Sequence, residues 1–459
     1  MSLSGALFTA VSALQADQGA LAVTSNNIAN VNTPGYSRQV AELEESPVVT
    51  YGDLQFGTGV DLTGVQGIRD NVLQLRLNQE SQAQGQLNTF VNGMNQIQPV
   101  FNEAAGSGLQ TLLSQFFNSF QQLATDPTNA GLRQSVISDG QSLAAGFNQA
   151  AAALDTQQQS ADQGVVQTVG QINTLTAQIA TLNGQISAAS GAGQTPNSLL
   201  DQRALLVNQL SQLVDVQSIT ADASGLTLTT SGGTLLVTGS QSFNLSTQTN
   251  TTTGFQDVYA QGADITATIQ SGNLAGYLQL RDQEVPALAS KLDTLASGIA
   301  AAVNTQNAAG FDLNGAAGGN FFVPPATTAG AALNLAVAIT DPSKIAASSD
   351  GTAGSNGNAT ALANLQNAPI VSGQNPIDYY SSLVFQVGND TANATSSLSG
   401  QQLIIQQLQD QQNSVSGVSL DQEGANLVLY QNAYGAAARV AGVIATLFQT
   451  AIALGTATQ

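Results

Sequence analysis

The chain has 459 residues, of which only 8% are charged, and its 9 basic against 29 acidic residues give a formal net charge of -20. Such a surface repels the phosphate backbone of nucleic acids, so we expect no nucleic-acid partner. Histidine and cysteine are absent, which excludes disulfides, thiolate or imidazole metal sites, and catalysis by a Ser-His-Asp triad or a Cys-His pair. At ~100 to 200 residues per domain, the length leaves room for two to four domains.

The first thirty residues predict a helix with an apolar seam. Apolar residues recur there every seven positions, a spacing typical of the contact line of a coiled coil. The helix is expected to end at Thr33-Pro34-Gly35, because this order suits a type II turn and the residue before a proline avoids the helical conformation. The residues of this N-terminal seam are Leu3, Leu7, Ala10, Leu14, Leu21 and Ile28.

Beyond the turn, residues 36–65 alternate in short runs punctuated by glycine, which predicts an extended arm of strands. Helical character returns at Ile68. The clearest interior helix is expected from about Arg133 to Ser190, where apolar residues again repeat every seven positions. Together with a further helix after the glycine-rich residues 191–196, these segments predict a long antiparallel bundle with glutamine and serine on its outside.

At Val216 the composition changes to short runs rich in threonine, valine and leucine, separated by Ser-Gly, Gly-Gly and asparagine-rich turns. This pattern is typical of β-strands. Helix is expected to resume at about Leu274 and to run through Asn304. A segment of mixed strand and loop follows, and the helical pattern returns at Pro376.

The last forty residues predict the second seam helix. Ser419, with Gln422 three residues on, resembles a capping box, and no proline interrupts the residues after it, so one helix of roughly 50 Å is expected. The two terminal helices could simply pair and close one monomer, or they could be polymerisation helices that are fully buried only when many subunits pack side by side. The residues of this C-terminal seam are Leu420, Leu427, Tyr430, Tyr434, Ala437, Ala441, Ile444 and Phe448.

The expected fold class is α+β and mainly α: long N- and C-terminal coiled-coil helices plus an antiparallel helical bundle, with an inserted β-rich outer domain. Residues 1–35 and 416–459 are expected to form a terminal coiled-coil polymerisation domain. Residues 36–215, 273–310 and 376–415 would form a mainly helical, rod-like domain with an extended arm. Residues 216–272 would be the β-rich outer domain, and residues 311–375 a mixed strand and loop segment packed with the outer or the rod-like domain.

No cleavable signal peptide is evident, because the first basic residue is Arg38 and a positively charged leader is missing. The last twenty residues carry no charge, but Thr446, Gln449 and Thr450 interrupt the apolar run. The period of seven indicates one apolar face rather than an apolar rod, so we expect no membrane span.

The segment Ala29-Asn-Val-Asn-Thr-Pro-Gly-Tyr-Ser-Arg-Gln39 resembles the signature of the bacterial flagellar axial proteins, which are the rod, hook and hook-associated components. The runs Ser416-Gly-Val-Ser-Leu-Asp421 and Tyr430-Gln-Asn-Ala-Tyr434 resemble the hook-associated members in particular, and Ser198-Leu-Leu-Asp-Gln-Arg203 is an interior match. The residues of the family turn motif are Asn30, Asn32, Thr33, Pro34, Gly35, Tyr36 and Arg38.

The resemblance implies a structural protein of the bacterial flagellum, exported by the flagellar type III system without a cleaved signal peptide. It would form the ring that adapts the hook to the filament, and it would be needed for filament assembly and motility. The implied partners are copies of the chain itself, the hook protein, a second hook-filament junction protein and a flagellar export chaperone. No catalytic residue or cofactor is implied.

Two alternatives stay open from the sequence. The first is a hook or rod subunit, against which the C-terminal runs argue. The second is a secreted glycan-binding adhesin or hydrolase, suggested by the asparagine- and threonine-rich stretch between Ser240 and Ile265, where no catalytic constellation is evident.

Overall fold

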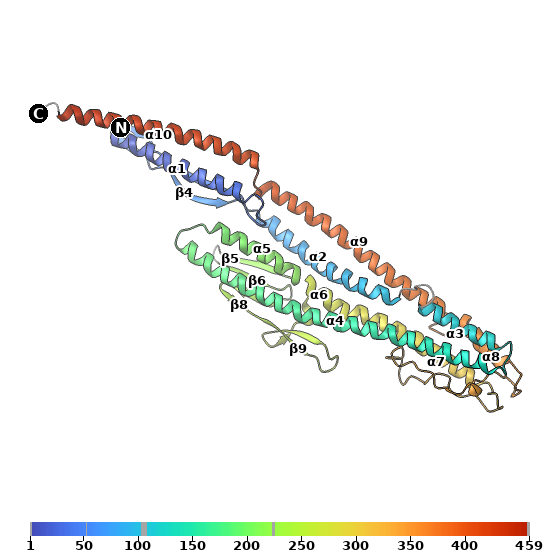
Figure 1. Ribbon diagram of the computed structural model, residues 1–459. Helices are drawn as coiled ribbons and strands as arrows, with labels where there is room; N and C mark the ends of the chain where they lie inside the picture. The colour runs from blue at the N-terminus through green and yellow to red at the C-terminus, as the bar shows by residue number, and fades with distance from the viewer. Residues whose placement is uncertain (1, 52, 102–107, 223–224, 457–459) are drawn as a thin grey trace.

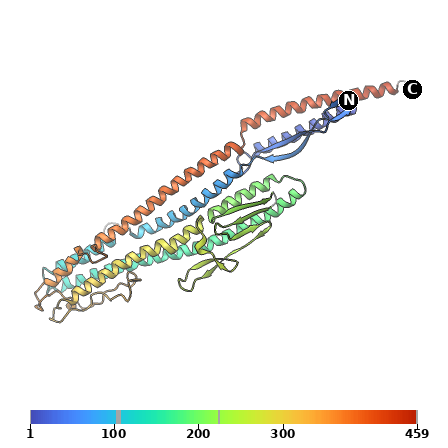
Figure 2. The same cartoon turned by 180° about the vertical axis from the view of Figure 1, so that it is seen from behind.

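The molecule is elongated and has its two termini together at one end (Figure 1). The computed structural model describes residues 2–51, 53–101, 108–222 and 225–456, so residues 1 and 457–459 of the expected terminal domain lie outside the described chain. We call α1, the turn 30–38, strands β1 to β4 and α10 the terminal unit, and helices α2 to α9 the rod. The view from behind shows the same two parts meeting at one joint (Figure 2).

Helices make up most of the chain. The α-helices are α1 (Leu3–Ala29), α2 (Asn71–Ile97), α3 (Leu109–Leu123), α4 (Ala130–Gly191), α5 (Asn197–Leu213), α6 (Gly272–Gln279), α7 (Val285–Ala308), α8 (Gly357–Asn364), α9 (Pro376–Ser416) and α10 (Leu420–Thr456). A π-helical segment, η3 (Leu280–Glu284), joins α6 to α7, and short 3-10 helices are η1 (Gln98–Phe101), η2 (Thr266–Thr268), η4 (Pro342–Lys344) and η5 (Leu365–Asn367).

The rod is built along α4, whose 62 residues span roughly 90 Å. Asn129 caps its start by accepting hydrogen bonds from two backbone N–H groups. Helix α2 lies between α9 on one side and α5 and α6 on the other. It can approach α5 closely because a Cβ on Gly85 would lie 2.1 Å from the carbonyl oxygen of Gln212, so any larger residue would force the two helices apart.

In the described part of the chain, eleven strands form small antiparallel sheets. They are β1 (Gln39–Glu45), β2 (Val49–Tyr51), β3 (Leu54–Phe56), β4 (Val60–Gly67), β5 (Gln217–Asp222), β6 (Gly225–Thr229), β7 (Leu235–Thr238), β8 (Gln241–Ser242), β9 (Leu245–Thr249), β10 (Gln256–Ala260) and β11 (Ala263–Asp264). Strands β1 and β4 pair, as do β2 and β3, and these two ribbons are the arm. Strands β5 to β8 form a four-stranded sheet, and β9 to β11 a three-stranded one.

The two larger sheets pack along α4 through β6 to β8 and through β9 and β10, and Figure 1 shows β8 and β9 along this helix. Buried residues of α4, among them Val165, Ile172 and Ile179, share one core with Leu228 of β6 and Val258 of β10. The heptad spacing that predicted a helix seam on α4 therefore marks a face that packs on sheets as well as on helices.

Residues 311–375 pack on the end of the rod farthest from the termini. Phe321 and Phe322 enter a cluster with Phe116 of α3, with ring centroids 5.5 and 5.4 Å from that ring. Buried Arg133 of α4 donates to the carbonyl oxygens of Pro127 and Ile345 at 2.6 and 2.8 Å. Helix α8 was not expected within this segment, because its Asn-Ala-Thr-Ala run has no marked apolar period. The expected fold class, mainly α with an inserted β-rich part, is confirmed.

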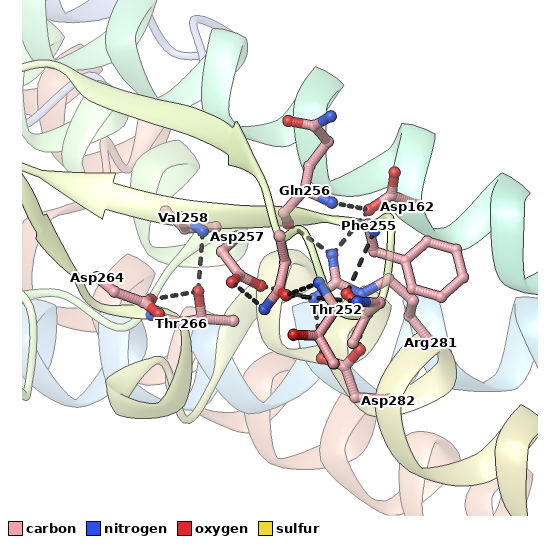
Figure 3. Close-up of polar contacts among 12 residues, drawn as sticks. Asp162, Thr252, Phe255, Gln256, Asp257, Val258, Asp264, Thr266, Arg281 and Asp282 are labelled. Carbon is pink, nitrogen blue, oxygen red and sulfur yellow. Dashed lines mark hydrogen bonds and ion pairs between the residues drawn. The ribbon is translucent and has the colours of Figure 1, made fainter.

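A buried arginine fastens the three-stranded sheet to the rod (Figure 3). The Arg281 side chain is 2% exposed, and its Nη1 donates to Asp162 of α4 at 2.8 Å and to the Gln256 carbonyl of β10 at 2.6 Å. Its other nitrogens form a two-pronged pair with Asp282. Burial opposes the charge of Arg281, but hydrogen bonds to Asp282 and Asp162 outweigh it and raise the pKa of the guanidinium.

Replacing Arg281 by alanine is expected to loosen the attachment of this sheet, because Asp162 and Asp257 would lose their cation in a largely buried setting. Removing one partner of such a pair costs roughly 3 kcal/mol, or about a hundredfold in local opening. Hydrogen exchange of residues 245–264 measures this. Alanine at the exposed Arg76 of α2 is the control, and equal protection in both variants would contradict the assignment.

Candidate assembly interface

Helices α1 and α10 run antiparallel and pack along each other, with the arm against α1. The deepest residues of α1 are not the predicted N-terminal seam but mostly a neighbouring face of small side chains. In the predicted seam, Ala10 is buried, Leu3 is exposed, and Leu7, Leu14, Leu21 and Ile28 are half-buried. The buried residues of α1 are Ala10, Ala16, Ala20, Val23, Thr24 and Asn27.

Small residues are deepest because two partners approach α1 from different sides. A Cβ on Gly19 would lie 2.3 Å from Leu62 of β4, and the Thr9 hydroxyl donates to the Thr58 carbonyl of the arm at 3.1 Å. The sequence pattern gave weight to leucine and missed this alanine face, since the arm that covers it lies some forty residues further along the chain.

On α10, most of the predicted C-terminal seam lies on the less exposed face. Ile444 is buried at 7% exposure, while Leu420 and Tyr434 are 55% and 40% exposed. The half-buried members are Leu427, Tyr430, Ala437, Ala441 and Phe448. These six lie on one side of the helix at the 3.6-residue period, which is the arrangement needed to pack on a single helix.

A second apolar face runs along α10 and is uncovered in the single chain. Val440, Val443 and Leu447 follow one another at spacings of three and four, and they are 53%, 61% and 51% exposed. Leu429 extends the same face towards the start of the helix at 60% exposure. At 100° per residue this outer face is turned by about 120° from the face that holds Ile444. Helix α1 therefore covers one apolar face of α10, and among the described elements no other packs along the outer face.

The turn after α1 has the geometry that its sequence predicts. The Tyr36 amide donates to the Thr33 carbonyl at 3.2 Å, and Gly35 has a φ of +78°, which suits glycine at the third position of a type II turn. The side chains of Asn30 and Thr33 bond to each other, whereas Asn32 and Pro34 are exposed. Through its backbone amide, Arg38 reaches the Ser416 carbonyl at 2.8 Å, just before α10 begins.

Asn27, which the sequence reasoning missed, ties this turn to the arm. Its side chain is buried, donates to the Gln39 carbonyl at 2.8 Å and accepts from the Gln39 amide at 2.9 Å. The same side-chain oxygen accepts from the Tyr36 hydroxyl at 2.8 Å. Burial, followed by the negative charges of Asp201 and Glu423, raises the pKa of Tyr36 to about 12, so its hydroxyl stays a donor throughout the physiological range.

The described part of the chain offers little for metal chemistry. No group of three or more histidine, cysteine, aspartate or glutamate side chains within it could hold a metal ion. A cavity of about 490 Å³ lies between the start of α1 and the arm, lined by Thr9, Val49 and Phe56, and one of about 350 Å³ lies between α2 and α4. The residues lining both cavities carry no charge.

Comparison with known proteins matches both ends and the interior of the chain. Residues 94–322 match the flagellar hook-associated protein FlgK helical domain, and residues 7–36 match the flagella basal body rod protein family. The chain is 32% identical over 482 residues to flagellar hook-associated protein 1 of Bacillus subtilis, with 95% of each chain covered. The chain belongs to the flagellar hook-associated protein 1 family. The Escherichia coli member is 30% identical over 98% of this chain and all of that one.

The fold of the hook-associated protein 1 family is also seen in a solved structure. The flagellar hook junction protein FlgK from Burkholderia pseudomallei superposes with a TM-score of 0.67 at 20% identity, covering 74% of this chain and all of that one. At that identity the likeness shows the fold alone. The match of residues 7–36 spans most of the N-terminal seam and most of the turn motif, so the family relationship reaches the interface described above.

One stretch could cross a membrane by length and composition only. Within Pro376–Leu454, one 18-residue window has a mean hydropathy of 1.6, and 6% of it is buried.

Replacing Asn27 by alanine is expected to weaken the attachment of the first residues of β1 to α1. The Tyr36 hydroxyl and the Gln39 amide would lose their acceptor, at a cost of about 1 to 3 kcal/mol. Hydrogen exchange of β1 should therefore speed up by roughly ten- to a hundredfold. Asn30→Ala is the matched control, because that side chain bonds only to Asn26 and Thr33 in its own turn. Equal exchange in the two variants would show that Asn27 does not hold the arm.

Proposed function

We propose that this protein is a structural component of the bacterial flagellum, which forms the junction ring between hook and filament and is needed for filament assembly and motility. The outer apolar face of α10 carries this proposal. Val440, Val443 and Leu447 expose apolar surface to water, and burying such surface gains about 25 cal/mol of free energy per Å². Burial against a partner is therefore favourable. Equivalent helices of neighbouring copies would be that partner.

This arrangement suggests a role for each domain of the chain. Residues 1–35 and 416–459 form the polymerisation domain, with the N- and C-terminal seams as its internal contact and the outer face of α10 as its contact to neighbours. Residues 36–215, 273–310 and 376–415 form the rod-like domain with the arm, and residues 216–272 point outward as the β-rich domain. Residues 311–375 close the far end of the rod.

The proposed partners are further copies of the chain, the hook protein and a second hook-filament junction protein. A flagellar export chaperone would cover α10 before assembly, since an amphipathic helix with an open apolar face is the natural docking surface. Export would use the flagellar type III route without a cleaved signal peptide and would place the protein outside the cell. We propose no enzymatic activity, cofactor, nucleic-acid partner or membrane span.

Two other functions have less support. A hook or rod subunit would share the N-terminal motif, but the relatives that match over nearly the whole chain are named hook-associated protein 1. A glycan-binding adhesin or hydrolase would need a site on the β-rich domain, and Asp257 and Asp264 of that domain are engaged in internal hydrogen bonds.

Deletion of the gene in its own bacterium tests the proposal. Bare hooks of normal length, with unassembled flagellin in the medium, are the expected result. Absent hooks would move the protein to the hook or rod, and working filaments would contradict the proposal.

Complementing the deletion with point variants tests the outer face. Val443→Asp should be exported yet fail to stay on the hook, because it places a charge at the proposed contact. Gln431→Asp puts the same charge on an exposed position of α10 outside both apolar faces, and it should restore filaments. Restoration by both variants would remove the outer face of α10 from the interface.

A further inference from the structure

The terminal unit and the rod meet through a small joint. Within the described residues, α1 and α10 pack along each other, α1 also packs along β1 and β4, and neither helix packs along a helix of the rod. The chain itself crosses the joint twice, at Ile68–Asp70 and at Gly417–Ser419. Parts of a chain with so little shared surface move relative to one another by default. Something other than packing must fix the angle between them.

Helix α5 supplies that restraint although it lies about 130 residues from the arm in sequence. Arg69, in the linker between β4 and α2, directs Nε and Nη2 at one carboxylate oxygen of Asp201 at 3.0 and 2.9 Å. Its Nη2 also donates to the Asn197 carbonyl at 2.9 Å, and its Nη1 to the Asn197 side chain at 3.2 Å. The Asp201 side chain is 9% exposed, so this is a shielded contact and not a surface ion pair.

The same two residues of α5 also hold the terminal unit directly. Asn197 donates to the Val65 carbonyl of β4 at 2.6 Å and accepts from the Gly67 amide at 3.1 Å. The second carboxylate oxygen of Asp201 accepts from the Ser37 amide, within the turn, at 3.2 Å. The turn 30–38, strand β4 and the linker between β4 and α2 are therefore all hydrogen-bonded to the first turns of α5.

The joint is otherwise loosely filled. A cavity of about 220 Å³ lies beside these contacts, with Arg69, Asp201 and Leu205 on one side and Gln409 and Gln412 of α9 on the other. A cavity beside a polar cluster means that side-chain packing at this place is incomplete. Besides the backbone hydrogen bond from the Arg38 amide to the Ser416 carbonyl at the end of α9, the hydrogen bonds of Arg69, Asn197 and Asp201 are the directional restraint seen among the described residues.

We propose that Asn197 and Asp201, acting on Arg69, form a clamp that sets the angle between the terminal unit and the rod. The clamp holds the turn, the end of β4 and the linker at Arg69. When these hydrogen bonds break, the terminal unit and the rod both stay folded. It gives a role to the Ser198–Arg203 run that the family resemblance singled out. If the protein is the junction ring proposed above, the clamp would set how far each copy can bend between a curved and a straight neighbour.

Pulsed electron spin resonance on the single chain tests the clamp. The chain has no cysteine, so nitroxide labels can be placed cleanly at Glu44→Cys on β1 and Gln178→Cys on α4, both exposed. The unaltered joint should give one narrow distance distribution. Asp201→Ala and Asn197→Ala should each at least double the width of the distance distribution. Asp201→Asn keeps the shape of the side chain but not its charge, and it should give a width between those of the parent and of Asp201→Ala.

Two controls separate loosening from unfolding. Asp155→Ala removes an exposed carboxylate of α4 that bonds only to Gln159 on its own helix, and it should leave the distribution unchanged. A second label pair inside the rod, Gln178→Cys with Gln411→Cys, should stay narrow in every variant. If the arm-to-rod width is the same in Asp201→Ala and Asn197→Ala as in the parent, the clamp is overturned. The result does not depend on assembly, so it stands even if the junction role fails.

Discussion

The packing of α10 on α1 is the contact on which the terminal unit depends. This packing cannot bury all the apolar surface of α10. One helix covers about one side of another, and α10 is apolar on two sides. Ile444, Ala441 and Phe448 lie towards α1, whereas Val443 and Leu447 are left to solvent. The single chain therefore leaves apolar surface exposed at this end, and burial of that surface would drive the association proposed above.

The scarcity of charge is consistent with this role. Of the few basic residues, Arg133 and Arg281 are buried and hold the far end and the β-rich part to the rod, and Arg69 holds the joint. Helix α10 carries only Asp421, Glu423 and Arg439 as charged residues in its described range, so little charge would have to be desolvated where copies are proposed to meet, and desolvating a charge is costly. The three arginines thus hold parts of one chain together, whereas the proposed contact between chains is made by the apolar outer face of α10.

Local chemistry made part of this predictable. Proline and glycine at positions 34 and 35 determine the turn, and the heptads of Leu7 and Leu427 mark helices that meet. The α+β class followed from the change of composition at Val216. The contacts of Asn27, Asp201 and Arg281 could not be predicted, since each depends on a partner that only folding brings close. The alanine face of α1 was missed for the same reason, because its cover is the arm.

Hydrogen exchange of the dilute monomer, compared with the protein assembled at the junction, tests the central claim most directly. Residues 3–14 and 440–451 lie far from the joint, and each segment has large apolar side chains, such as Phe8 and Val443, that are more than half exposed in the single chain. The account predicts fast exchange there in the monomer and strong protection after assembly. Full protection of both segments in the dilute monomer would mean that α1 and α10 satisfy each other, and it would contradict an assembly driven by the outer face of α10.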